Sequence, residues 1–275
     1  MARIEEILAL ERIDDLIFRG PAVESTLTRT FGGQVAGQAL VAAVNTVDDE
    51  RPVHSLHGYF LRPGDSSEPT VFLVDRLRDG RSFSARQVRG VQRGETIFSM
   101  QASFHIAGDS GPDHSDEMRA VPDPEELGEE GQLRPPGSRE LLDEWGDWDI
   151  RVVPPERYEP NKYAASQQVV WFRSQRRLPD DPKFHQCTLA YMSDMTLLHS
   201  SLVPHPDTKV QMASLDHAIW FLRPFRADDW LLYDQTSPSA HGGRAMTQGR
   251  IFNRAGDLVA QVTQEGLVRT LDEAR

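Results

Sequence analysis

The sequence predicts an α+β fold made of two tandem units, each an antiparallel sheet wrapped around one central helix. The residues FLRP occur twice, at Phe60–Pro63 and at Phe221–Pro224. A glycine that marks a tight turn follows each copy at nearly the same distance, Gly94 in the first and Gly256 in the second. A segment with helical spacing of its apolar residues precedes each copy. These three observations indicate that the chain contains a duplicated unit.

The first unit is expected to span residues 1–107. Its central helix is predicted over residues 32–47, GGQVAGQALVAAVNTV, where small and apolar residues recur at helical spacing and allow close approach to other backbone. The strand that follows ends at Pro63, because proline cannot donate to a sheet ladder. The glycine turn at Gly94 joins two strand-like runs and predicts antiparallel pairing.

Residues 108–160 are expected to form a linker. This stretch is rich in Pro, Gly and acidic residues, as in GDSGPDHSDE and PDPEELGEEG. We expect no more than a short helix near Arg139–Trp145.

The second unit is expected to span residues 161–275 and to carry the catalytic residues. Its central helix is predicted over residues 189–203, LAYMSDMTLLHSSLV, and ends before Pro204. This placement puts Asp194 near the start of the helix, where an N-cap role is the plain structural alternative. The second glycine turn, at Gly256, again joins two strand-like runs.

The amino-acid composition limits the classes of protein to which this chain can belong. The 275 residues are 39% hydrophobic and 26% charged, as in a globular protein large enough for a stable core. The single cysteine, Cys187, allows no intramolecular disulfide and no cysteine-based metal site. The net charge of −12 argues against a nucleic-acid partner. The densest basic stretch, Arg173–Arg177, is either a solvated strand end or a contact for a phosphate-bearing ligand.

The chain has no run of apolar residues long enough to span a membrane. Its first residues are acidic and helix-patterned, unlike a secretory signal. We therefore expect a cytoplasmic protein without a membrane partner.

Three polar residues are present in only one copy of the repeat and are candidates for a site. The region of the first copy that corresponds to Asp194 has no carboxylate. Ser214 stands where the first copy has Val53, and Gln264 stands where it has Ala102. Gln264 also interrupts an apolar stripe along its predicted strand, although an exposed strand end is the alternative interpretation.

The pattern of a helix wrapped by a curved antiparallel sheet, found twice, is that of a double hot-dog fold. The chain closely resembles the acyl-CoA thioesterase II family. The resemblance covers both halves and most of the chain outside the linker, and the segments that carry it are FGGQVAGQAL, VHSLHGYFLRPGD, LRDGRSFSARQV, SDMTLLHSSL, LDHAIWFLRPF, DDWLLY and QEGLVR.

The resemblance implies hydrolysis of acyl-CoA, with medium and long acyl chains the usual range. It places Asp194, Ser214 and Gln264 on the positions of a hydrolytic triad, with serine where many members have threonine. Asp194 would accept a proton from the attacking water, which the other two residues would hold. Backbone N–H groups of Gly33 and Gln34 are candidate donors to the oxyanion. We expect no metal, no bound cofactor, and association into a dimer or tetramer of chains.

Two alternatives stay open. Asp194 and His199 have a spacing that resembles hot-dog enoyl-CoA hydratases, although the Asn-Pro typical of those enzymes is absent. A non-catalytic acyl-CoA-binding module on the same scaffold is the other. A covalent role for Ser214 is disfavoured, because no G-x-S-x-G elbow occurs and His217 is expected on the opposite strand face.

Overall fold

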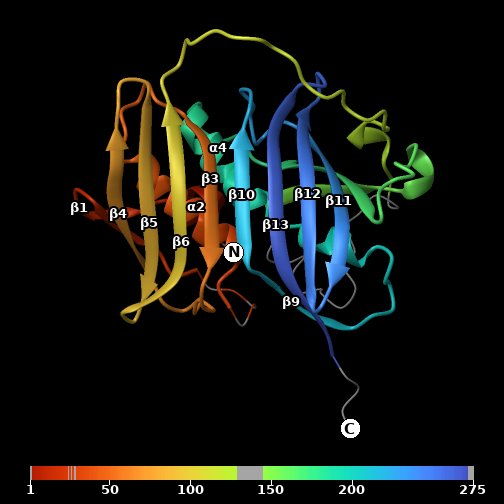
Figure 1. Ribbon diagram of the computed structural model, residues 1–275, viewed down its shortest axis with the longest axis horizontal. Coiled ribbons are helices and arrows are strands. Elements are labelled where there is room, and N and C mark those ends of the chain that lie inside the picture. Colours follow the sequence, from red (N-terminus) through yellow and green to blue (C-terminus); the bar gives the residue numbers. More distant parts are fainter. Residues whose placement is uncertain (1, 24, 26, 28, 129–144, 272–275) are drawn as a thin grey trace.

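A computed structural model describes residues 2–23, 25, 27, 29–128 and 145–271 of the chain. Within these residues, thirteen strands form one antiparallel sheet (Figure 1). Its strands run in the order β1-β2-β4-β5-β6-β3-β10-β13-β12-β11-β8-β7, and β9 pairs with β13 beside this path.

The elements follow one another along the chain in two similar groups. The first group comprises α1 (Ile4–Ile7), β1 (Glu11–Asp14), β2 (Ile17–Gly20), α2 (Gly32–Val44), β3 (Val53–Phe60), β4 (Thr70–Asp79), β5 (Phe83–Gln92) and β6 (Glu95–His105). Between the groups lie the short helix η1 (Pro124–Glu126), the strand β7 (Trp148–Val153) and the short helix η3 (Pro155–Arg157). The second group comprises β8 (Gln167–Ser174), α4 (Pro182–Met192), η4 (Leu198–Leu202), β9 (Val210–Ser214), β10 (Asp216–Phe221), β11 (Leu231–His241), β12 (Arg244–Asn253) and β13 (Leu258–Thr270).

The strand order is mirrored about the centre of the sheet. The strands β4-β5-β6-β3 stand on one side, and β10-β13-β12-β11 repeat this order in reverse on the other. The two FLRP segments begin at Phe60 and Phe221, the last residues of β3 and β10, and these two strands pair with each other at the centre. The predicted turns also form, since Gly94 and Gly256 both have positive φ, at 82° and 89°.

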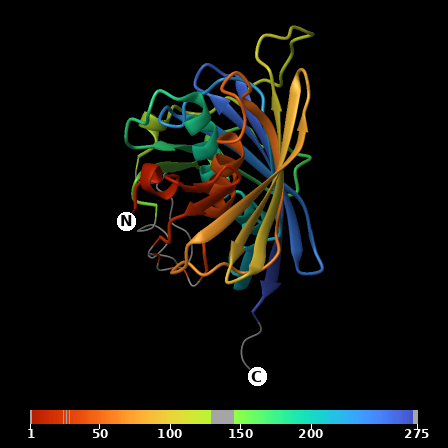
Figure 2. The ribbon, with the colours of Figure 1, turned by 90° about the vertical axis from the view of Figure 1, so that its left-hand side faces the viewer.

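The helices α2 and α4 pack against each other on one face of the sheet (Figure 2). The helix predicted over residues 32–47 is confirmed as α2, although it ends at Val44 and residues 45–47 form a turn. It contacts strands β3, β4, β5 and β6. Its small residues allow the expected close approach: a Cβ atom at Gly33 would lie 2.3 Å from the backbone oxygen of Tyr191 in α4. Almost every residue of α2 is buried, so this helix forms the centre of the core.

The helix predicted over residues 189–203 is wrong in its placement. The helix α4 begins at Pro182, where the side chain of Asp181 accepts a hydrogen bond from the N–H of Lys183 and caps the helix. It ends at Met192, and the chain then turns before the short 3₁₀ helix η4. Asp194 therefore lies in the turn after α4, and not near the start of a helix.

The stretch expected to be a linker contains a strand. β7 pairs with β8 and extends the sheet at its far edge. The segment after β6 crosses the end of the sheet to the second half (Figure 1), where Arg119 makes an ion pair with the buried Asp234. Trp145 lies in a turn, and the rest of the short helix expected near Arg139–Trp145 lies outside the described residues.

A separate apolar cluster fills the other face of the second half of the sheet. It includes Trp171, Leu232 and Phe252, with Met118 and Val121 from the crossing segment packed against it. Among the described residues, no helix is long and apolar enough to cross a membrane.

Candidate active site

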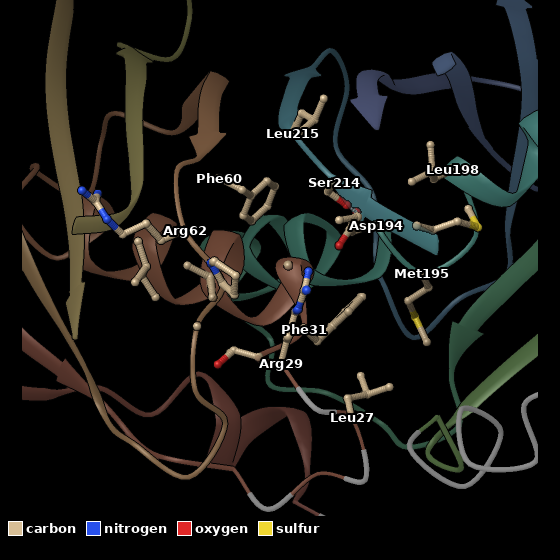
Figure 3. A pocket seen from close by; sticks show the side chains of 18 of the residues that line it. Leu27, Arg29, Phe31, Phe60, Arg62, Asp194, Met195, Leu198, Ser214 and Leu215 are labelled. Carbon is tan, nitrogen blue, oxygen red and sulfur yellow. Dashed lines mark hydrogen bonds between the residues drawn. The ribbon is translucent and has the colours of Figure 1, made fainter. Parts of the chain in front are cut away.

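Three polar side chains meet next to the N-terminal end of α2. Ser214 Oγ donates a hydrogen bond to Asp194 Oδ1 at 3.1 Å. Gln264 Nε2 donates to the same carboxylate oxygen at 2.7 Å and to Ser214 Oγ at 2.6 Å. The structure thus brings together all three candidates that the sequence singled out, and Figure 3 shows Ser214 beside Asp194.

Each of these residues comes from a different element of the second half. Asp194 lies in the turn after α4, Ser214 ends β9, and Gln264 lies within β13. In the β9–β13 ladder Ser214 pairs with Gly266, which shares a strand face with Gln264. The antiparallel register therefore places the hydroxyl and the amide side by side.

Gln264 is fully buried, with 0% of its surface exposed. Together with Ala260 and Val262 it lies on the face of β13 that packs against the main core, as the alternation in the sequence indicated. Leu258, expected on the same stripe, packs instead into the cluster on the other face, because the register shifts at that end of the β12–β13 ladder. The alternative interpretation, an exposed strand end, is wrong. A buried amide needs hydrogen-bond partners, and Gln264 has them on both its nitrogen and its oxygen.

The first half contributes the surroundings of the carboxylate. The backbone N–H of Gly33 hydrogen-bonds Asp194, so the N-terminal end of α2 faces this negative group. A Cβ atom at Gly32 would lie only 2.6 Å from Asp194 Oδ2. A helix dipole therefore favours negative charge on Asp194, but this helix is α2 of the first half and not the second central helix, near whose start Asp194 was expected.

A cavity of about 580 Å³ opens beside Asp194 and Ser214. Both halves of the chain line it (Figure 3), and much of its wall is apolar. Its lining includes Phe31, Gly32, Phe60, Leu61, Arg62, Trp145, Met195, Leu198, His199 and Leu215. The carboxylate and the hydroxyl thus face a space that is large enough for part of a small-molecule ligand.

Burial dominates the electrostatics of the site. It raises the pKa of Asp194 above the ordinary value, although the nearby His217 and the hydrogen bonds from Gln264, Ser214 and Gly33 act in the opposite direction. Burial also lowers the pKa of His217, which favours its neutral imidazole. A carboxylate with a raised pKa beside a cavity is a stronger proton acceptor than an exposed one.

Sequence reasoning missed His217. This side chain makes no hydrogen bond to Ser214, as expected, but its Nδ1 lies 3.2 Å from Gln264 Oε1, and His217 does not line the cavity. The signal was present in the repeat: His217 stands at the position of Leu56 in the first copy. The rule that found the other three residues, a polar residue in one copy only, also selects His217.

The oxyanion donors expected at Gly33 and Gln34 stay a prediction. The N–H of Gly33 bonds Asp194, and the residues of the same turn that line the cavity are Gly32 and Val35. The first N–H groups of a helix have no partner within the helix, so this turn can still offer a donor.

The hydratase alternative gains no support from the geometry. His199 lines the cavity, but among the described residues it makes no hydrogen bond to Asp194, whose partners are Ser214, Gln264 and Gly33. Among the residues that the structure describes, no cluster of three or more His, Cys, Asp or Glu side chains could hold a metal ion.

Comparisons with known proteins identify the family of this chain. The profile of the family described as acyl-CoA thioesterase matches residues 142–267, and that of the acyl-CoA thioesterase N-terminal domain matches residues 22–105. Acyl-coenzyme A thioesterase 8 of Mus musculus is 40% identical over 97% of this chain and 88% of its own length. The chain belongs to the acyl-CoA thioesterase family.

Solved structures extend the likeness to the fold. The crystal structure of the acyl-CoA thioesterase II TesB2 from Mycobacterium marinum has a TM-score of 0.88 and 55% identity, and the match covers 99% of this chain and 100% of that one. A hot-dog protein from Alicyclobacillus acidocaldarius has a TM-score of 0.80 at 20% identity, over 98% of this chain and 99% of the other. The expected hot-dog architecture is therefore confirmed at the level of the fold.

Proposed function

We propose that this chain is an acyl-CoA thioester hydrolase in which Asp194, Ser214 and Gln264 activate a water molecule. The water oxygen attacks the thioester carbonyl carbon while its proton passes to Asp194. The carbon–sulfur bond then breaks, and the proton returns to the departing thiolate. The products are a free carboxylic acid and the CoA thiol. Water and the thioester supply all their atoms, so the proposed reaction consumes no cofactor.

One observation carries this proposal: a buried carboxylate, a hydroxyl and an amide meet at the wall of a largely apolar cavity. Gln264 and Ser214 both donate to Asp194 Oδ1, which supports an ionised carboxylate that is held in one orientation. A water molecule in the cavity can reach both Asp194 and Ser214, because both residues line it. Such positioning makes the attack effectively intramolecular.

The oxyanion is proposed to form at the first turn of α2. Gly33 and Gln34 were the expected donors, and Gly32 and Val35 are the residues of that turn that line the cavity. The N–H of Val35 already bonds the carbonyl oxygen of Phe31, which leaves Gly32 as the donor next to the cavity. The positive end of the helix dipole favours negative charge at this place. The N-terminal end of α2 then stabilises negative charge on both the Asp194 carboxylate and the developing oxyanion.

The wider organisation is part of the proposal. The mirrored strand order and the two FLRP strand ends support a double hot-dog, that is, a tandem duplication of which only the second unit, from about residue 161, supplies the polar triad. The apolar cavity wall supports medium and long acyl chains as substrates. We further propose a cytoplasmic enzyme that associates into dimers or tetramers.

The test is thiol release from a panel of acyl-CoAs of short to long chain length. Asp194→Asn keeps the shape of the side chain but removes the proton acceptor, so kcat should fall at least ~100-fold, the usual scale of acid–base catalysis. Circular dichroism and thermal melting would show that the variant remains folded.

Asp75→Asn is the matched control. Asp75 is an exposed carboxylate on β4, away from the cavity, and its change should leave kcat unaltered. Unchanged thiol release in Asp194→Asn would refute the assignment. Loss of the conjugated double bond of an enoyl-CoA without thiol release would instead indicate a hydratase.

A further inference from the structure

A second layer of buried polar groups lies behind the triad. His217 is 1% exposed, and its Nδ1 lies 3.2 Å from Gln264 Oε1. Its other ring nitrogen, Nε2, lies 2.8 Å from Ser193 Oγ. Ser193 immediately precedes Asp194, and its carbonyl oxygen accepts a hydrogen bond from the hydroxyl of Tyr233 at 3.1 Å.

We propose that His217 is a positioning residue that holds the amide of Gln264 in its working orientation. This inference rests on the proposed function, since it assigns a role toward the same triad. His217 does not line the cavity, so it acts through Gln264 and not on the substrate.

The direction of the hydrogen bonds explains why such a residue is needed. Gln264 can assist Asp194 only when its NH₂ group faces the carboxylate and the hydroxyl, because both N–H bonds are used there. A flipped amide would place its oxygen against the Asp194 carboxylate. A neutral His217 that carries its proton on Nδ1 donates to Gln264 Oε1 and opposes this flip, because the flipped amide would set two donors against each other.

Ser193 supports that tautomer of His217. Gln264 Oε1 can only accept, so the ring proton sits on Nδ1. The unprotonated Nε2 then accepts from the Ser193 hydroxyl at 2.8 Å, a shorter contact than the 3.3 Å from the same hydroxyl to the carbonyl oxygen of Ala190. The donors then all point the same way, from Ser193 through His217 and Gln264 to Asp194. Hydrogen bonds in such a chain polarise one another, and the chain ends on the group that must be ionised to accept a proton.

A comparison with the first half of the chain supports a functional role for His217 and Gln264. In the ladder of β10 and β13, Ala218 pairs with Thr263. His217 and Gln264 are the neighbours of these two residues, one on each strand, toward the same end of the ladder. The corresponding residues of the first half, Leu56 and Ala102, pair with each other in the β3–β6 ladder, and both are buried. The fold therefore accepts an apolar pair at this place, and a buried polar pair carries a desolvation cost that the fold itself does not require.

The test compares three variants that differ in which ring nitrogen they replace. His217→Asn places an amide N–H near the position of Nδ1, whereas His217→Gln places one near Nε2, and His217→Leu removes both. We expect His217→Asn to keep most of the kcat, and the other two to lose it about 10- to 100-fold, the scale seen when outer-shell partners of a reactive group are removed. KM should change little in all three, because the cavity wall is untouched.

A double-mutant cycle separates positioning from general stability. If His217 acts through Gln264, adding His217→Leu to Gln264→Ala should lower kcat no further, even where the melting temperature falls. Additive losses, or equal kcat in all three His217 variants, would overturn the inference. If Asp194→Asn abolishes thiol release while His217→Leu does not, only this inference fails; if Asp194→Asn is fully active, the proposed function fails first.

Should His217→Leu not fold, Ser193→Ala gives the second measurement. It leaves the imidazole in place but removes the hydroxyl that donates to Nε2 in the proposed tautomer. We expect a lower kcat at unchanged KM, and the loss should again vanish in a Gln264→Ala background. An unaltered kcat in Ser193→Ala together with full activity in His217→Gln would contradict the proposed series of hydrogen bonds from Ser193 to Asp194.

Discussion

Burial gives Asp194 a proton affinity that suits its proposed work. The carboxylate is surrounded by protein, and desolvation raises its pKa more than its donors lower it. Gln264 and Ser214 nevertheless hold it in place through hydrogen bonds of 2.7 Å and 3.1 Å. Catalytic acids and bases are commonly tuned in this way toward the operating pH.

This tuning predicts how stability and activity depend on pH. The folded protein binds the Asp194 proton more tightly than the unfolded chain does, so the free energy of unfolding falls as pH rises from the ordinary pKa of 3.8 through the raised value. Asp194→Asn removes this effect and should melt at a higher temperature than the natural chain at pH 7. The gain should shrink toward zero below pH about 4, where the carboxyl is protonated in both states.

Melting temperatures of both chains across the acid range measure the effect. In the same window kcat of the natural chain should fall as the pH decreases, since the base becomes protonated. A variant that is less stable than the natural chain at pH 7, or a kcat that stays flat down to the ordinary aspartate range, would contradict the raised pKa.

The sequence alone selected Asp194, Ser214 and Gln264, because its two similar segments that contain FLRP can be compared with each other. Ser214 and Gln264 replace apolar residues of the first copy, and this difference selects them without any structure. His217 passes the same criterion but was considered only as a partner of Ser214. Its contact with Gln264 depends on the pairing of β10 with β13, which the sequence does not state.

At the scale of elements, the site depends on how closely α2 approaches the end of α4. Gly33 lies against the backbone oxygen of Tyr191, and Gly32 lies against Asp194. A side chain at either position would need to displace its neighbours. The glycines at the start of α2 therefore set the distance between the helix end and the carboxylate.

Gly33→Ala tests this packing. Its added Cβ would lie 2.3 Å from a backbone atom, which cannot swing away as a flexible side chain can. We expect a loss of about 1–3 kcal/mol in the free energy of unfolding, the usual cost of overpacking, and a lower kcat because the Gly33 N–H moves from Asp194.

Denaturant unfolding and thiol release would be measured on the same samples. Gly111→Ala is the matched control, because nothing lies within 4 Å of a Cβ atom at Gly111. An alanine at position 33 that leaves both quantities at the level of this control would show that α2 and α4 are not tightly packed there.

The two helices were not equally predictable. The repeat and the small apolar residues gave α2 almost to its ends, because nearly all of its residues are buried and its pattern is complete. For the second helix, the apolar residues continue past Met192 through the turn into η4. The pattern therefore did not show that α4 ends at Met192. The start was nevertheless encoded by Asp181 and Pro182, an N-cap followed by proline at the first helical position.

At the scale of the whole molecule, the site lies between the two halves. The second half supplies Asp194, Ser214 and Gln264, whereas the first half supplies the Gly33 N–H and part of the cavity wall, including Phe60. The β3–β10 ladder and the contact of α2 with α4 join the halves. Neither half alone contains the complete site.

The second half on its own should therefore be inactive, although it carries the whole triad. A fragment of residues 145–271 would expose the edge of β10 that pairs with β3 and the face of α4 that packs on α2. We expect no thiol release from this fragment, because Asp194 would lose its helix end and the cavity would lose a wall. Co-expression with residues 1–128 should restore turnover, since the central ladder and the helix contact can re-form without the intervening chain.

The restored activity must belong to the joined halves and not to a contaminating enzyme. Asp194→Asn in the fragment of residues 145–271 should abolish it, while Asp75→Asn in the fragment of residues 1–128 should not. Turnover by residues 145–271 alone at the rate of the whole chain would show that the first half is a passive neighbour. Such a result would also remove the reason for the glycines at the start of α2, since their close approach to Asp194 would then serve no chemistry.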